Sequence, residues 1–104
     1  RMLLKRRRPP APGRITRLAP VVRFNNEVSD TATLVEFVGE DRPGLLYDLA
    51  TAFSGAGCDI ELVLIDTEGH KALDVFYVKR GGAKLDDALA TLLKQSLLQA
   101  GTGV

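Results

Sequence analysis

The chain has 104 residues, of which 45% are hydrophobic and 26% charged, with a formal net charge of +1; these values predict one soluble globular domain and exclude a disordered or fibrous protein. Its only cysteine, Cys58, excludes an intramolecular disulfide and a cysteine-based zinc cluster. No apolar run approaches the roughly 20 residues that span a bilayer, so we expect a cytoplasmic protein with no membrane partner.

The first 20 residues combine a basic run with closely spaced prolines. Prolines at this density cannot continue a helix or join the interior of a sheet. We expect residues 1–20 to be a basic, proline-rich linker outside the domain, with an RNA- or membrane-binding arm as the alternative. The remaining chain is mildly acidic, so it lacks the basic face of an electrostatic nucleic-acid binder, and no nucleic-acid partner is expected.

The first half of the domain is predicted to be a hairpin followed by a helix. Apolar and β-branched residues predict strands at 21–24 and 31–38, and the residues between them favour a turn. Apolar residues then recur at helical spacing over 44–56, until Gly55 and Gly57 end the pattern. We therefore expect one helix after the first two strands.

The second half repeats this order. Residues rich in Val, Ile, Phe and Tyr predict strands at 59–66 and 71–79. A second amphipathic helix is expected over 88–97, with Asp86 and Asp87 suitably placed at its start. The order strand, strand, helix, strand, strand, helix predicts an α+β domain with one sheet and both helices on one face.

The strands of the second hairpin are apolar on both faces. In the strand at 59–66, for example, Leu62 and Leu64 alternate with Val63 and Ile65. Two helices can cover only one face, so the other face or an edge is expected to meet another protein surface. The alternative is that a small sheet tolerates scattered apolar exposure.

The residues that could carry chemistry are few. His70 is the only histidine and falls in a predicted turn, and Cys58 stands alone, so no catalytic or metal-binding cluster is predicted. Asp74 lies among apolar residues, where we expect a structural hydrogen bond. Gly81 and Gly82 are too short a run for a nucleotide-binding loop. We expect no catalytic residue, metal or cofactor.

The turn between the second strand and the first helix is more informative. Pro43 stiffens it, Gly44 leaves room for close approach, and the free amides of the helix start carry a partial positive charge. Asp41 adds an acceptor for the ammonium or amide group of the same molecule. This pattern fits a zwitterionic ligand such as an amino acid, although Pro-Gly also marks ordinary strand-to-helix turns.

Four short segments together resemble ACT domains, over about residues 21–98. They are residues 41–46 (Asp-Arg-Pro-Gly-Leu-Leu), 59–60 (Asp-Ile), 67–69 (Thr-Glu-Gly) and 74–78 (Asp-Val-Phe-Tyr-Val). In addition, residues 22–29 are similar to the lead-in to the last ACT domain of PII uridylyltransferases.

This resemblance implies a ferredoxin-like fold with an antiparallel four-stranded sheet and two helices on one face. Residues 101–104 are too short for the family's last strand, so we expect a flexible tail there and an ACT domain over 21–100. The strand at 21–24 is expected to fill the sheet position of the missing last strand.

The resemblance also implies an amino-acid ligand, suspected to be glutamine, in a regulatory domain with no catalytic activity of its own. Catalytic domains of a parent uridylyltransferase/uridylyl-removing enzyme and another ACT domain, as a homodimer or a tandem copy, are the expected protein partners. The implied ligand-binding residues are Asp41, Arg42, Gly44, Leu45 and Leu46, with Asp59 and Ile60 on a facing strand. The alternatives are a ligand-free interaction or dimerisation module and a regulator of another pathway of amino-acid metabolism.

Overall fold

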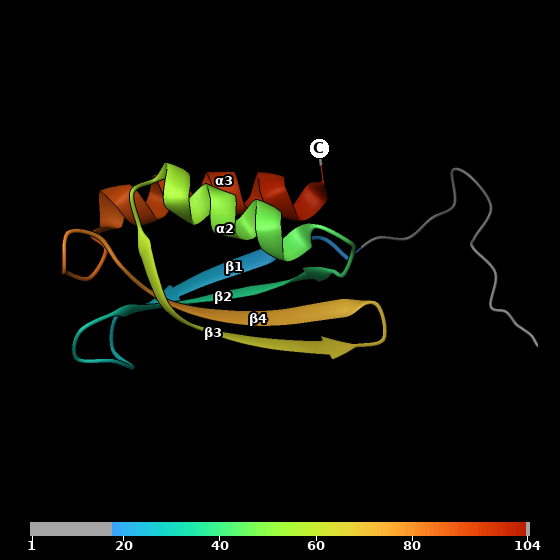
Figure 1. The fold of residues 1–104 in the computed structure, drawn as a ribbon, viewed down its shortest axis with the longest axis horizontal. Coiled ribbons are helices and arrows are strands. Elements are labelled where there is room, and N and C mark those ends of the chain that lie inside the picture. The colour runs from blue at the N-terminus through green and yellow to red at the C-terminus, as the bar shows by residue number, and fades with distance from the viewer. Residues whose placement is uncertain (1–17, 104) are drawn as a thin grey trace, which may run out of the picture.

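A computed structural model describes residues 18–103; the expected linker's residues 1–17, and Val104, lie outside this range. The described elements are β1 (Val21–Asn25), β2 (Thr33–Glu40), α2 (Leu45–Gly55), β3 (Asp59–Glu68), β4 (Lys71–Lys79) and α3 (Asp87–Thr102), shown in Figure 1. Their order and type agree with the sequence-based prediction. None of the described helices is long and apolar enough to cross a membrane.

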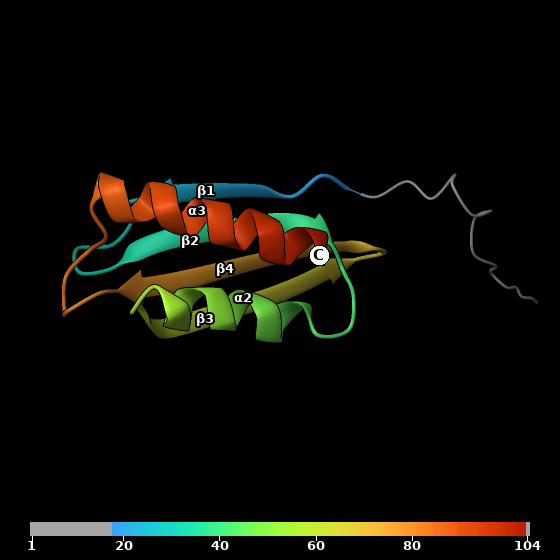
Figure 2. The same ribbon diagram turned by 90° about the horizontal axis from the view of Figure 1, so that it is seen from above.

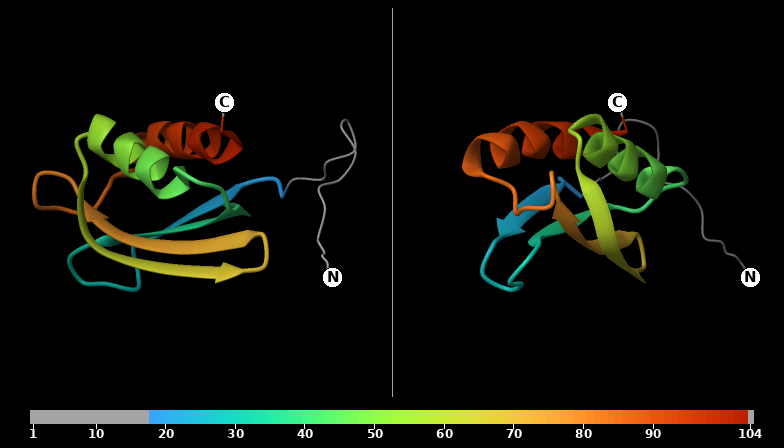
Figure 3. Two further views of the ribbon diagram at one scale, coloured as in Figure 1. Left: turned by 45° about the vertical axis from the view of Figure 1, so that its right-hand side comes forward. Right: turned by 60° about the vertical axis from the view of Figure 1, so that its left-hand side comes forward.

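The four strands form one antiparallel sheet in the order β1-β2-β4-β3. Both helices lie on one face, with α3 over β1 and β2 and α2 over the β3–β4 hairpin (Figure 2). Among the described residues, no helix lies on the other face of the sheet (Figure 3). β1 occupies the edge beside β2, as expected for an N-terminal strand that replaces the usual last strand of a ferredoxin-like fold.

The core lies between the helices and the covered face of the sheet. Phe53 of α2 packs on Phe76 of β4, with ring centroids 4.8 Å apart and planes tilted by 46°, a favourable arrangement for aromatic pairs. The other side chains with less than 2% exposure are those of Val35, Phe37, Leu49, Val78, Leu93 and Leu97, with that of Thr33. Their alternation along the strands places them on the face of the sheet that the helices cover.

The buried Thr33 ties the first hairpin to the loop before α3. Its hydroxyl accepts a hydrogen bond from the backbone amide of Leu85 at 2.9 Å and donates one to the side chain of Asn26. The Asn26 amide in turn donates to the backbone oxygen of Leu85 at 3.1 Å. Asp86 then caps α3 by accepting from the backbone amide of Leu89 at 2.8 Å. These bonds fix where α3 begins.

The expected flexible tail at 101–104 is wrong for its first two residues, because α3 continues through Thr102. Gly101 is buried in the last turn of the helix, above the ring of Phe37. Since glycine has no side chain, the helix backbone can approach this ring closely. The helix ends at Gly103, whose φ of 74° is the left-handed conformation usual after a helix C-terminus.

Gly101→Ala should therefore destabilise the domain, although alanine normally favours a helix. A Cβ at this position would lie 2.7 Å from Cε1 of Phe37 and 3.0 Å from Cβ of Pro20. We expect a loss of about 1–3 kcal/mol in the free energy of unfolding, measured by thermal denaturation. Gly55→Ala in α2 is the matched control, because nothing lies within 4 Å of its Cβ, and it should be neutral or slightly stabilising. A stabilised Gly101→Ala variant would contradict the packing described.

Candidate ligand-binding site

The turn between β2 and α2 is held in place from two sides. The backbone amide of Asp41 donates a hydrogen bond of 2.7 Å to the backbone oxygen of His70 in the β3–β4 turn. Gly44 then starts the helix with a φ of 81°, a left-handed conformation that residues other than glycine rarely adopt. The turn is thus fixed at the sheet end where Glu40 pairs with Lys71.

The first turn of α2 leaves backbone amides without partners. Leu45 N bonds to the oxygen of Arg42 at 3.2 Å and Asp48 N to that of Gly44 at 2.9 Å, and no side chain caps the helix. Among residues 18–103, the amides of Leu46 and Tyr47 have no backbone partner, and these residues are 45% and 74% exposed. Free amides at a helix N-terminus are suited to binding a carboxylate.

The two terminal nitrogens of the Arg42 guanidinium are engaged within the chain, whereas its buried Nε has no hydrogen-bond partner among the described residues. Its Nη2 donates to Oδ2 of Asp48 at 2.9 Å and to the backbone oxygen of Ala100 in the last turn of α3. Its Nη1 donates to the backbone oxygen of Pro43 at 3.3 Å. A cation is stabilised near the C-terminal end of a helix, so this side chain joins the β2–α2 turn to α3.

The seven expected site residues do not all lie together. Asp41, Arg42, Gly44, Leu45 and Leu46 form one group, in which Leu45 is buried in the core and Leu46 is exposed. Asp59 and Ile60 lie at the opposite end of the sheet, because they pair with Lys79 and Val78. Within one chain, these two residues do not face the turn.

Asp74 is the one buried acidic residue among residues 18–103. It lies in β4 between Phe37 of β2 and Ile65 of β3, and is only 3% exposed. Its Oδ1 has no hydrogen-bond partner among the described residues. Burial raises the pKa of its carboxyl group, the negative charge of Asp41 raises it further, and a backbone hydrogen bond at Asp66 lowers it.

The structural hydrogen bond expected for Asp74 therefore satisfies at most one of its two carboxylate oxygens. The alternation of residues along β4 places Asp74 on the same, buried face as Ala72 and Phe76. This pattern could have indicated that Asp74 is buried. An ionisable residue in an otherwise apolar, buried series is costly unless its polar atoms are paired. Such residues concentrate at functional sites.

His70 lies in the predicted turn, and Cys58 lies in the core. Cys58 is 7% exposed within the core, and burial raises the pKa of its thiol, which disfavours the reactive thiolate. His70 is exposed in the β3–β4 turn. In residues 18–103, no three His, Cys, Asp or Glu side chains are grouped so that they could hold a metal ion.

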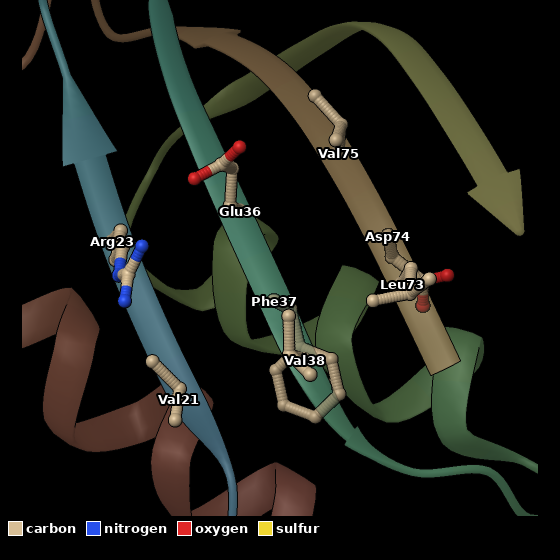
Figure 4. Close-up of a pocket in the computed structure, with 8 residues that line it drawn as sticks. All are labelled: Val21, Arg23, Glu36, Phe37, Val38, Leu73, Asp74 and Val75. Atoms are coloured by element: carbon tan, nitrogen blue, oxygen red, sulfur yellow. The ribbon is translucent and has the colours of Figure 1, made fainter. Parts of the chain in front are cut away.

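The uncovered sheet face carries a shallow hollow across β1, β2 and β4. In Figure 4, Val21 and Arg23 of β1 and Glu36 of β2 lie on neighbouring strands, with Leu73 and Val75 of β4 beyond them. Arg23 and Glu36 are cross-strand neighbours in an otherwise mainly apolar surface. The polar residues that line the hollow are Arg23, Glu36 and Asp74, and the others are apolar, so this face is suited to contact with a protein.

Comparison with known proteins gives matches to one family. The model of the ACT domain family matches residues 33–97. The chain is 47% identical over 85 residues to a bifunctional uridylyltransferase/uridylyl-removing enzyme of Phenylobacterium zucineum, which covers 80% of this chain and 9% of that protein. A protein of the same name in Azospirillum brasilense is 46% identical, and the match covers 74% of this chain and 8% of that protein. Another in Caulobacter vibrioides is 41% identical, and the match covers 80% of this chain and 9% of that protein. The match thus spans less than a tenth of each relative.

Asp74→Asn should stabilise the domain at neutral pH and lose this effect in acid. Because the pKa of Asp74 is raised in the folded state, its contribution to stability is fully present below the usual aspartate pKa and is lost as the pH rises through the folded value. Near pH 7 the neutral side chain should raise the free energy of unfolding by about 1 kcal/mol. Below about pH 4 the variant and the native chain should be equal.

Urea denaturation from pH 3.5 to 8 measures this difference. Asp30→Asn is the control, because Asp30 is exposed in the turn between β1 and β2, and its effect should be small at every pH. A variant that is less stable than the native chain at pH 7 would show that the ionised Asp74 is well compensated within the fold.

Proposed function

The chain belongs to the ACT domain family, and from this premise we propose that it is the glutamine-sensing regulatory domain of a PII uridylyltransferase/uridylyl-removing enzyme. In this role it has no catalytic activity. It binds the amino acid at the β2–α2 turn and signals nitrogen status to catalytic domains elsewhere in the parent protein, in the cytoplasm. The matches to enzymes of this name support the choice of parent.

The observation that carries the proposal is the uncapped start of α2. The amides of Leu46 and Tyr47 are free to hold the ligand's α-carboxylate, and the left-handed Gly44 keeps this end of the helix open. Asp41 lies beside it with an exposed side chain. A cationic group of the ligand would be attracted to Asp41, so both ends of a zwitterion find complementary charge.

The charges around the turn also favour glutamine over glutamate. Asp41, Asp48 and Asp74 are all acidic, whereas Arg42 already bonds to Asp48 and to the end of α3. A second carboxylate on the ligand would add a negative charge near Asp41 and Asp48. The neutral amide of glutamine avoids this repulsion.

A second ACT domain would complete the site. β3 is an edge strand with exposed Leu62 and Leu64, and exposed edge strands favour pairing with another chain. If two copies pair antiparallel along β3 about a two-fold axis, Asp59 and Ile60 of the second copy come to lie at the end of β3 nearest the first copy's β2–α2 turn. The two separate groups of expected residues would then lie close to each other across the interface.

The uncovered apolar sheet face supports the alternative function, a module that docks onto another ACT or catalytic domain without a ligand. Its exposed or partly exposed side chains include those of Val21, Leu64, Leu73 and Val75. The two functions differ in one measurable property. Only the sensor binds an amino acid.

Calorimetric titration of the native chain with L-glutamine tests the proposal, and Gly44 offers a matched pair of variants. Asn and Asp tolerate a positive φ better than other side chains, and they differ here chiefly in charge. Gly44→Asp should weaken glutamine binding at least about tenfold more than Gly44→Asn, because its carboxylate would repel that of the ligand. Glutamate should bind more weakly than glutamine to the native chain.

Thermal unfolding provides a second readout, since a ligand at one hundred times its Kd stabilises the folded state by about 2.7 kcal/mol. Absence of heat and of a thermal shift with L-glutamine would favour the ligand-free module. Equal binding by the two Gly44 variants would show that the ligand's carboxylate does not bind at the start of α2.

A further inference from the structure

The uncovered face of the sheet carries a row of side chains whose charged and apolar halves are separate. Strand pairing aligns one residue from each strand across this face, in the order Arg23, Glu36, Val75 and Leu64. Val75 is partly exposed, and the other three are exposed. The charges of this row therefore lie over β1 and β2, and its apolar side chains lie over β4 and β3.

The apolar half extends into the rows on either side. Leu73 and Tyr77 lie two residues before and after Val75, and Leu62 lies two residues before Leu64. They share the uncovered face, because side chains alternate along a strand. Leu62 and Leu64 are 49% and 50% exposed, and Leu73 and Tyr77 are partly exposed. Exposed apolar side chains gathered on one face indicate contact with another protein.

The two charges at the other end of the row are neighbours that do not pair. Arg23 and Glu36 lie directly opposite each other on β1 and β2, yet no ion pair joins them within residues 18–103. In Figure 4, both side chains stand on this face with their charged ends apart. Both charges are therefore available to a partner that offers one charge of each sign.

We propose that this face binds the same face of a second copy of the chain, about a two-fold axis. The axis lies between the two sheets and runs across the strands, along the row from Arg23 to Leu64. Each strand then lies antiparallel over its counterpart, and Val75 and Leu64 contact the same residues of the partner. Arg23 of each copy lies between its own Glu36 and the partner's Glu36, so four charges of alternating sign meet.

The pattern of the row is what selects a second copy in this orientation. A surface that is charged at one end and apolar at the other is complementary to itself when a two-fold axis runs along it, because like halves then meet. A two-fold axis parallel to the strands, along the middle of the sheet, would instead place Arg23 against Leu64 of β3. The charges would then be buried without partners, which is costly.

The size of the face predicts a weak dimer. Neighbouring strands lie about 4.8 Å apart and each residue advances about 3.3 Å along a strand, so the face measures roughly 20 by 20 Å. Two such faces in contact bury an area at the low end of specific protein interfaces. We therefore expect a Kd that is micromolar or weaker, with the strands of the two sheets crossing at about 30°.

This interface goes beyond the proposed function and does not depend on it. α2 and the turn before it lie on the helix side of the sheet (Figure 2), so an amino acid bound there would not touch the interface. The backbone edge of β3 also stays free, because packing of one sheet on another uses side chains of the faces. Association through this face should therefore be equal with and without L-glutamine.

Charge reversal tests the inference, with the Kd of dimerisation measured by analytical ultracentrifugation. Arg23→Glu leaves two negative charges in the row, and Glu36→Arg leaves two positive charges. Each variant alone should dimerise at least about tenfold more weakly than the native chain, because like charges then face each other. An equimolar mixture of the two variants should associate again. Lys94→Glu, an exposed position on α3, is the matched control and should keep the native Kd.

The mixture distinguishes this interface from other surfaces. If the native chain dimerises and both variants keep its Kd, the copies meet elsewhere, for example along the β3 edge, and the inference is wrong. If the mixture associates no better than each variant alone, the charges do not meet across a two-fold axis, and it is again wrong. A native chain that stays monomeric up to its highest soluble concentration would also overturn it. Circular dichroism of each variant confirms folding.

Discussion

The bond between Arg42 and the end of α3 determines the shape of the proposed site. This side chain reaches from the β2–α2 turn to the backbone oxygen of Ala100, and on the way it pairs with Asp48 in the first turn of α2. It thus links the start of one helix to the end of the other, where the partial charges have opposite sign. The close packing of Gly101 on Phe37 is what brings the end of α3 within its reach.

This arrangement separates the residues that build the site from those that face a ligand. Arg42 and Leu45 position the turn, whereas the amides of Leu46 and Tyr47 have no backbone partner among the described residues. A ligand that satisfies them binds the folded state selectively and so stabilises it.

The sequence was sufficient for the elements and for the apolar character of both sheet faces, because the strand pattern around Phe76 and the helical spacing around Leu49 are local. The candidate turn was likewise predicted from residues 41–46. The contact of Arg42 with Ala100 was not, since it joins positions 58 apart. The distance of Asp59 from the turn was not predicted either, because it depends on strand register. The extension of α3 through Gly101 depends on the contact of this residue with Phe37, which the local Gly-Thr-Gly sequence does not reveal.

The central claim is that the free amides at the start of α2 hold the carboxylate of an amino acid. Backbone amide NMR during a titration with L-glutamine tests it most directly, since each amide reports its own hydrogen bond. The account predicts saturable shifts that are largest at Leu46 and Tyr47, while Arg23 and Glu36 on the uncovered face change little. Shifts that are largest on that face, with Leu46 and Tyr47 unaffected, would contradict it.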